Sequence, residues 1–393
     1  MGGTLVKPIV FKSIFARKPW LKWTMIIVSI VIIVGGFFLW RTGSLLNKIS
    51  FKSNIFTSIV NSLPGVDKTL KGESDGRINI ALLGMRGEHV TGGGLLTDTI
   101  MILSIHPSVG ENDPAKVSLV SIPRDLYVTE PGTSNQMKIN AVHALGEAKG
   151  TGQGLKSMEE ILGEVTGVPI DYAISISFKG FTDLVNAVDG IDVTLKEPFS
   201  EGVQFREPKV CDPYVFNVPT VPQQFENKYH TRQDGTKYVA KSYPLCYNKD
   251  VECGGLFALP AGVNHLDGDK ALCYARARYT SNDFERARRQ QIVLQALKDK
   301  ALSVGTLTDF VKINGILNAL GDNVRTDMEG WEMKRLFDIY QKTGSSPALT
   351  QKVLEDSEEG LLYAPQETKE TGYILKPRGD NYDRIHALFN SLP

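Results

Sequence analysis

The sequence has no excess of charge of either sign, because 44 Lys and Arg residues balance 44 Asp and Glu residues along the 393-residue chain. Nucleic-acid-binding proteins usually carry a clear basic excess, so nucleic acid is not the expected partner. There are only six histidines and four cysteines, and their spacing matches no common zinc pattern. The glycine-rich stretch 85–96 is not followed by the Gly-Lys-Ser/Thr of a phosphate-binding P-loop. Function must therefore be sought in local features.

One such feature is an apolar N-terminal run. Residues 23–40 carry no charge, have tryptophans at both edges, and follow a segment rich in Lys and Arg. This pattern predicts a single transmembrane helix at 23–40, with residues 1–22 in the cytoplasm and the remaining chain outside. A cleaved signal peptide is the alternative, but the run is longer than a typical signal core and no clear cleavage site follows it. Residues 41–76 are predicted to form a stalk and linker.

Residues 77–393 have the composition of a globular domain. Apolar runs rich in β-branched residues predict strands at 78–84, 100–105, 117–122, 172–176 and 191–195. Amphipathic stretches predict helices at 155–165, 178–188, 284–302, 307–320, 328–340 and 382–392, with a last strand at 372–375. Alternating strands and helices predict an α/β sheet with helices on both faces.

The stretch 197–260 interrupts this alternation. It is rich in Pro, Tyr, Asn and Lys, and we expect a loop-rich or β-rich insertion. It contains Cys211, Cys246 and Cys253, and an extracytoplasmic location would favour one disulfide among them. The fourth cysteine, Cys273, lies in an apolar stretch and is predicted to be a buried free thiol.

Five arginines are concentrated in residues 275–291, ARARYTSNDFERARRQQ. Arg276 and Arg278 would share one face of a strand, and Arg286, Arg289 and Gln290 would share one face of a helix, for which Asp283 is a candidate N-cap. Guanidinium groups match phosphate oxygens in geometry and stay charged, so convergence from both sides predicts an anion site. The alternative is a solvated charged helix face, which we prefer for Arg288.

Two further residues stand at predicted strand ends. Arg124 follows the strand 117–122, where ligand sites gather in α/β sheets, and Asp125 beside it could orient its guanidinium or cap a turn. Asp98 stands at the entry to the strand 100–105, where a carboxylate can hold a divalent cation. A lone aspartate at such a position is more often a turn or cap residue.

The order of these motifs resembles the LytR-CpsA-Psr family. INIALLG, LTDTIMILSI, SIPRD, KINAVHALG, LDG..ALCYARAR and R..RQQ follow one another between about residues 78 and 302. The resemblance implies an α/β/α sandwich with a mostly mixed central sheet and an apolar channel for a lipid. It also implies a membrane-anchored, extracytoplasmic phosphotransferase that uses Mg²⁺. Such enzymes move a glycopolymer from a polyprenyl-pyrophosphate carrier onto peptidoglycan.

The resemblance also implies residue roles. Pyrophosphate would be bound by Arg124, Arg276, Arg278, Arg286, Arg289 and Gln290, and Mg²⁺ by Asp98. Catalysis would rest on Arg124, Arg278 and Arg286, with Asp283 as a candidate base.

The chain departs from the family at Met85, where an aspartate usually supplies a second metal ligand. Methionine is a poor ligand for a hard cation, and Glu88 or His89 is a possible replacement. Leu96 stands where the family is usually basic, and Arg86 is a possible substitute for that charge. These departures keep two alternatives open, which are a polyprenyl-diphosphate hydrolase and a non-catalytic binding or regulatory protein of the envelope.

Overall fold

The computed structural model describes residues 68–88, 94–107, 115–201, 222–232, 235–246, 257–277, 281–303, 310–342 and 349–392. The predicted membrane segment 23–40 lies outside these ranges. Within them, no helix is both long enough and apolar enough to cross a bilayer.

The centre of the domain is a six-stranded mixed sheet in the order β13-β6-β1-β2-β3-β14. Strand β1 pairs in parallel with β6, β3 pairs in parallel with β14, and the other pairs are antiparallel. The strands are β1 (Ile78–Met85), β2 (Thr97–His106), β3 (Lys116–Ser121), β6 (Tyr172–Ser177), β13 (Val324–Thr326) and β14 (Leu349–Val353).

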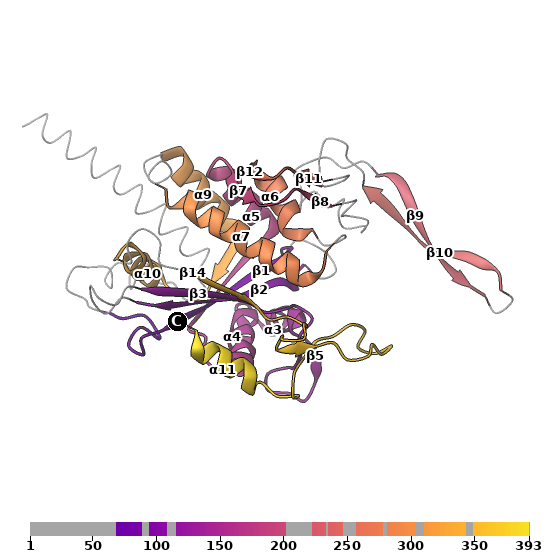
Figure 1. Ribbon diagram of the computed structural model, residues 1–393, viewed down its shortest axis with the longest axis horizontal. Helices are drawn as coiled ribbons and strands as arrows, with labels where there is room; N and C mark the ends of the chain where they lie inside the picture. The colour runs from indigo at the N-terminus through magenta and orange to yellow at the C-terminus, as the bar shows by residue number, and fades with distance from the viewer. Residues whose placement is uncertain are drawn as a thin grey trace, which may run out of the picture. The chain divides into compact units, whose positions relative to one another are not determined.

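Helices cover both faces of this sheet, which confirms the predicted layers (Figure 1). One face packs against α3 (Val142–Lys149), α4 (Gln153–Thr166) and α11 (Asp383–Ser391). The other carries α5 (Phe178–Ala187), α6 (Gly268–Arg276), α7 (Asp283–Ala301), α9 (Phe310–Asn323) and α10 (Gly330–Lys342). We call these the closed face and the open face, since the second holds an apolar cavity described below.

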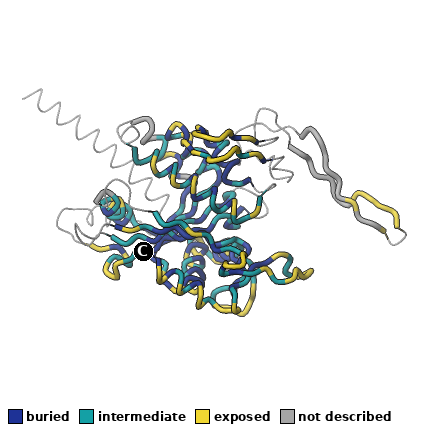
Figure 2. The backbone as a smooth tube through the Cα atoms, in the orientation of Figure 1, coloured by how far each residue is buried: buried dark blue, intermediate teal, exposed yellow. Residues whose placement is uncertain are grey.

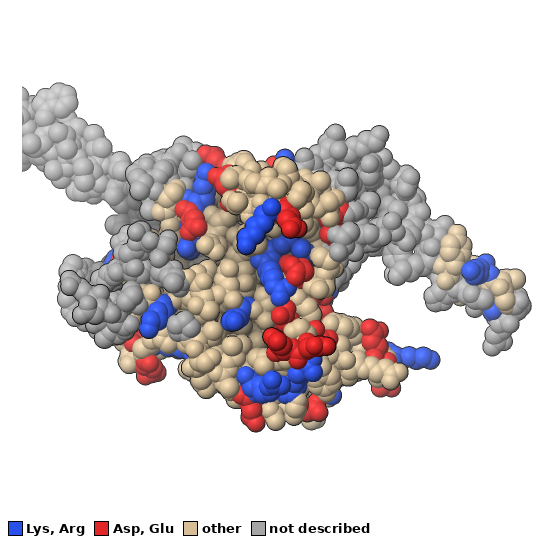
Figure 3. All heavy atoms as spheres, in the orientation of Figure 1, with Lys and Arg blue, Asp and Glu red and all other residues tan. Residues whose placement is uncertain are grey.

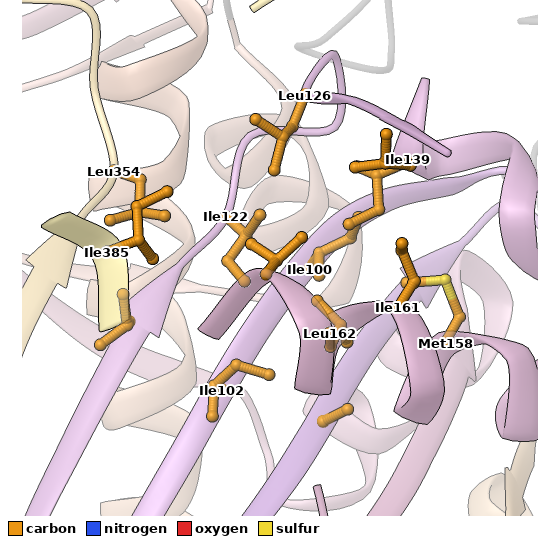
Figure 4. Packing of buried hydrophobic residues seen from close by; sticks show 14 of the residues in the cluster. Ile100, Ile102, Ile122, Leu126, Ile139, Met158, Ile161, Leu162, Leu354 and Ile385 are labelled. Atoms are coloured by element: carbon orange, nitrogen blue, oxygen red, sulfur yellow. The ribbon is translucent and has the colours of Figure 1, made fainter. Parts of the chain in front are cut away.

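Alternation along β1 and β2 divides their side chains between the two faces. Leu83 and Ile102 belong to the core of the closed face. Figure 4 shows Ile102 in this core together with Met158 and Ile161 of α4. Their neighbours Leu82 and Met101 turn to the open face. Apolar packing on both sides explains why these central strands are continuous apolar runs and why the sheet is the most buried part of the domain (Figure 2).

Shorter ladders complete the fold. They are β4 (Tyr127–Thr129) with β5 (Gln136–Lys138), β7 (Ile191–Leu195) with β12 (Gly262–Leu266), β8 (Phe199–Glu201) with β11 (Phe257–Leu259), β9 (Pro222–Thr231) with β10 (Lys237–Cys246), and β15 (Leu362–Tyr363) with β16 (Lys376–Pro377). A 3-10 turn, η2, spans Ile139–Ala141. The β9–β10 hairpin confirms that the insertion 197–260 is partly β-structure.

The predicted strand at Arg276 and Arg278 is wrong for Arg276, which ends helix α6. The Asp267 side chain caps this helix by accepting from Lys270 N, and Ala271, Leu272 and Ala275 form its buried face. Such spacing at i, i+1 and i+4 is helical, so the ALCYA run should have indicated a helix.

Three smaller predictions are also corrected. Asn282, not Asp283, caps α7, because its side chain accepts from Glu285 N. The predicted strand 372–375 is reduced to two isolated bridges, of Gly372 with Thr368 and of Leu375 with Leu126, and β16 follows it. Cys273 is disulfide-bonded rather than free. An apolar neighbourhood accommodates a disulfide sulfur as well as a thiol, so burial did not distinguish the two.

Candidate active site

The site forms where β1, β3 and β6 end and β2 begins, at one edge of the sheet. Pairing of β2 with β3 places Met101 opposite Ser121, and the same register carried three residues further puts Asp98 opposite Arg124. Their side chains meet, with Arg124 Nη1 2.6 Å from Asp98 Oδ1. The sequence-predicted pair is thus brought together by the antiparallel register.

Arg124 is held from a second side by Asp125. Its Nε lies 3.5 Å from Asp125 Oδ2, while Lys138 Nζ donates to Asp125 Oδ1 at 2.7 Å. Burial alone would lower the pKa of Arg124, but the nearby carboxylates of the site outweigh it and raise the pKa. The guanidinium is therefore charged and oriented before any ligand binds. Asp125 acts as the orienting residue that the sequence suggested.

Helix α7 brings Arg286 to the same place from the open face. Arg286 is only 8% exposed, and its Nη1 lies 2.8 Å from Asp283 Oδ1. Its Nη2 donates to the Asp98 backbone oxygen at 3.4 Å. Asp283 and Arg286 both lie in the first turn of α7, which Asn282 caps. Arg286 therefore connects the start of α7 to the start of β2 at Asp98.

The end of β1 supplies a third guanidinium. Arg86 Nε lies 3.9 Å from Asp98 Oδ2. That Arg86 substitutes for a basic residue at position 96 stays a prediction. Met85 is buried beside it, at 4% exposure. Glu88 is paired with Arg325 of β13, 3.7 Å away, rather than turned toward Asp98. His89 lies outside the described residues.

The remaining predicted residues divide into two groups. The guanidinium of Arg276 stacks on the Phe178 ring at 4.6 Å and borders the apolar cavity. Gln290 also borders this cavity and donates to the Ala275 oxygen at 3.2 Å. Arg289 instead donates to the Tyr274 and Ala277 oxygens and to Ser281 Oγ, so it holds the segment between α6 and α7. Arg278 lies outside the described residues.

Two cavities meet at this edge. A small polar cavity of about 20 Å³ is lined by Asp98, Arg124, Asp125, Asp283, Arg286 and Tyr373, among others. An apolar cavity of about 280 Å³ lies between the open face of the sheet and helices α5, α6, α7 and α9, and its lining includes Leu82, Met101, Phe181, Leu184 and Leu294. Thr99 and Gln290 line both cavities, so they mark the junction of a charged compartment with an apolar one. Phe181 and Leu184 of α5 both pack against the buried core and line the apolar cavity.

Charge around the site is mixed rather than uniformly basic. Lys and Arg side chains are interspersed with Asp and Glu side chains on the face shown in Figure 3. The arginines near the site are also paired with acidic residues: Arg124 and Arg286, which line the polar cavity, and Arg86 beside Asp98 each have a carboxylate neighbour. An incoming anion would compete with these carboxylates for guanidinium groups that are already in place.

Asp98 is the one predicted metal ligand, and the described residues contain no group of three or more His, Cys, Asp or Glu side chains able to hold an ion. Mg²⁺ commonly uses one or two carboxylates together with substrate phosphates and water. The donor set therefore fits Mg²⁺ only as an ion that a bound diphosphate also ligates, with Asp98 as the protein's carboxylate.

Three site residues were not assigned a role from the sequence. Lys138 stands in the KINAVHALG motif, and Thr99 lies between Asp98 and the predicted strand 100–105. Tyr373 lies far along the chain, and nothing local to it indicated a site.

The combination of an α/β/α sandwich, an apolar cavity and an adjoining arginine cluster defines a protein suited to an amphiphilic anion. The chain belongs to the LytR-CpsA-Psr family, since the LytR_cpsA_psr family model matches residues 50–373.

Among curated relatives, a Bacillus cereus protein named polyisoprenyl-teichoic acid–peptidoglycan teichoic acid transferase TagU is 26% identical over 339 residues, which cover 83% of each chain. An Enterococcus faecalis protein of the same name is 27% identical over 242 residues, covering 61% of this chain and 57% of that protein. Solved structures support the fold. Bacillus subtilis TagV aligns with a TM-score of 0.51 and 23% identity, covering 80% of this chain and 96% of TagV. TagT bound to LI-WTA aligns with a TM-score of 0.51 and 20% identity, covering 84% and 94%.

Proposed function

We propose that this protein transfers a glycopolymer from a polyprenyl-diphosphate carrier to a sugar hydroxyl of peptidoglycan and releases polyprenyl phosphate. The observation that carries the proposal is the junction at Thr99 and Gln290, where the apolar cavity meets the arginine-lined one. A lipid diphosphate has the same two-part character, with an apolar chain joined directly to a dense negative charge. The named activity of the TagU relatives agrees with this assignment.

In this reaction the acceptor hydroxyl attacks the phosphorus next to the glycan. A new oxygen–phosphorus bond forms, the bond from this phosphorus to the bridging oxygen breaks, and polyprenyl phosphate leaves with the electron pair. Catalysis is mainly positional and electrostatic, because phosphoryl transfer needs developing charge to be stabilised. Arg124 and Arg286 lie where they would hold the diphosphate, with Arg276 on the lipid side and Arg86 beside Asp98. Arg278 keeps its predicted role here.

Asp283 is the proposed acceptor of the hydroxyl proton, because it lines the polar cavity beside Arg124 and Arg286. Arg289, in contrast, is proposed to act as a positioning residue. Its buried guanidinium donates to the carbonyl oxygens of Tyr274, in the last turn of α6, and of Ala277, just after that helix. Pyrophosphate binding, predicted for it from the sequence, would require it to leave these partners.

Mg²⁺ is the proposed cofactor, and Asp98 its proposed ligand. When bound with the diphosphate, the ion would supply positive charge at the phosphate oxygens. Because one carboxylate makes a weak site, we expect Mg²⁺ to bind measurably only when a diphosphate is also present. Isothermal titration with Mg²⁺, with and without a soluble short-chain polyprenyl diphosphate, tests this; equal binding without the diphosphate would contradict it.

Membrane attachment is part of the proposal. Residues 23–40 would anchor the chain once, with residues 1–22 in the cytoplasm and the domain in the extracytoplasmic space. Such an anchor would keep the apolar cavity near the membrane that holds the lipid-linked donor. Protease protection of either end in intact cells would check this orientation.

Substitution of Arg124 tests the catalytic role most directly. Loss of a charge that stabilises the transition state typically costs about 10²–10³-fold in rate, so Arg124→Ala should reduce transfer of glycan from a polyprenyl-diphosphate donor to peptidoglycan by at least that factor. Arg288→Ala is the matched control. Arg288 is on the same helix as Arg286 but pairs at the surface with Glu285 and Glu355.

If Arg124→Ala attaches the polymer to peptidoglycan as fast as the parent protein does, the proposal is wrong. Release of polyprenyl phosphate that is the same with and without peptidoglycan would instead favour a hydrolase. In that case water, rather than a sugar hydroxyl, would be the acceptor.

A further inference from the structure

Tyr373 projects into the polar cavity from a part of the chain far from the arginine motifs. It lines this cavity together with Asp98, Arg124 and Asp283, yet its ring is 38% exposed. A partly exposed tyrosine on the wall of a charged cavity offers a ligand both an apolar ring face and a hydroxyl group.

The backbone around this tyrosine is firmly held. Leu375 N donates to the Asp125 oxygen at 2.9 Å, and Tyr127 N donates to the Leu375 oxygen at 2.8 Å. Ile374 and Leu375 are buried at 4% and 2% exposure. On the other side, Gly372 closes a turn in which its N–H donates to the Thr368 oxygen at 2.9 Å. The ring is thus presented from a fixed support, which lowers the entropy lost when a ligand packs on it.

The geometry of the reaction determines which group reaches this ring. In phosphoryl transfer the attacking and leaving oxygens lie roughly in line across the phosphorus. The leaving group carries the lipid, which occupies the apolar cavity on one side of Thr99 and Gln290. The attacking hydroxyl must therefore approach from the opposite side, where Tyr373 lines the polar cavity and is partly exposed. The sugar ring that carries it would stay outside, on the exposed part of Tyr373, because a cavity of about 20 Å³ has room for only about one water molecule.

The chemistry of this side suits a neutral, hydroxyl-rich molecule. Burial raises the pKa of Tyr373, and nearby carboxylates add to the effect; they belong to Asp356, Asp125, Asp283 and Glu367. The phenol therefore stays neutral at physiological pH and cannot serve as a base. Carboxylate oxygens accept hydrogen bonds from sugar hydroxyls, and an amphipathic tyrosine offers a flat face for the C–H face of a pyranose ring.

We propose that Tyr373 is the acceptor-binding platform of this enzyme, on which a pyranose ring of the peptidoglycan glycan strand packs while its hydroxyl points toward the phosphorus. This inference rests on the proposed transfer function and adds to it the side from which the acceptor enters. The ring is supplied by the segment 368–375, whose anchoring residues Ile374 and Leu375 lie past the part of the chain that the family model matches.

The test is steady-state kinetics of the full-length protein in detergent, with a synthetic polyprenyl-diphosphate-linked glycan as donor and a soluble peptidoglycan oligosaccharide as acceptor. We expect Tyr373→Ala to raise the acceptor KM about tenfold, the size of one lost aromatic contact, while the donor KM and the slow release with water stay within about twofold of the parent values. Tyr373→Phe, which keeps the ring, should stay close to the parent. Tyr363→Phe is the matched control, because Tyr363 bonds Asp380 outside the cavity.

An unchanged acceptor KM in Tyr373→Ala overturns the inference, and so does a rise in donor KM alone, which would place the donor sugar on the ring. If the proposed transfer function is wrong, the parent protein itself transfers no glycan to the acceptor. Saturation-transfer NMR with the oligosaccharide alone tests the Tyr373 site independently of transfer activity. Binding that the parent shows and Tyr373→Ala loses supports the glycan site whatever the activity, and equal binding by both proteins opposes it.

Discussion

The two faces of the central sheet are built from the same kinds of side chain and yet differ in function. On the closed face, Ile100, Ile102 and Val120 belong to a buried core that packs against α4 and α11. On the open face, Leu82 and Met101 of the same strands border a cavity of about 280 Å³. The difference lies in the helices, since α5, α6, α7 and α9 lie across the open face without filling it. An apolar strand can therefore serve stability on one side and ligand binding on the other.

Filling the cavity should have the largest effect. Leu294→Trp places a large ring in the apolar cavity from α7, and we expect transfer to fall about 100-fold because the lipid and its diphosphate are displaced. The unfolding temperature should change little, since the new ring occupies existing space. Ile292→Trp is the control, because Ile292 on the same helix is 38% exposed and does not line the cavity. If Leu294→Trp and Ile292→Trp have the same transfer activity, the apolar cavity does not bind the lipid of the donor.

Adjacent residues of β2 allow the faces to be compared directly. Ile102→Ala on the closed face should cost about 2–5 kcal/mol of unfolding free energy, because a void opens in a filled core. Met101→Ala on the open face should cost about 1–2 kcal/mol, since its side chain already borders empty volume and less packing is lost. Chemical denaturation of both variants measures the difference. Equal losses would mean that the open face is as tightly packed as the closed one.

The smallest predicted effect is a pH dependence at His143 on α3, beneath the closed face. Its burial lowers the pKa below the ordinary value of 6.5, although Glu147 and the Leu95 oxygen oppose this. The unfolded chain then takes up a proton that the folded chain refuses, so stability present above about pH 6.5 is lost as the pH falls toward the lowered folded value. His143→Gln should flatten the unfolding temperature between pH 7 and pH 5. The prediction is wrong if the unfolding temperature of the parent protein changes with pH as much as that of His143→Gln does.

Much of the fold could be predicted because its signals are local. The strands from Ile78, Val117 and Tyr172 and the helices from Leu155 and Phe178 have clear periodicity, and the structure confirms them within a few residues. Short or edge elements were missed, among them β13 and β14. Three to five residues carry too little pattern, and their pairing with β6 and β3 depends on distant partners.

In the candidate site, too, some residue positions could be predicted from the sequence and others could not. Arg124, Arg286 and Asp98 were predicted from motifs and do converge. Arg289 looked equivalent to Arg286, three residues away on the same helix, but its guanidinium donates to the carbonyl oxygens of Tyr274 in α6 and of Ala277 just after α6. Helical spacing places two residues on one side of a helix; it does not say whether a cavity or a loop lies opposite each of them.

By itself, the sequence determined that this is an α/β protein with a concentration of arginines in one stretch, an apolar N-terminal run and the motifs of one family. These properties depend on residue type and spacing along the chain, which are written in the sequence. Only the tertiary structure decided that Arg124 and Asp98 meet through the β2–β3 register, that one face of the sheet is hollow, and that Tyr373 reaches the polar cavity. Each of these depends on segments far apart in the chain packing together, and the space left between packed elements has no signature in any one of them.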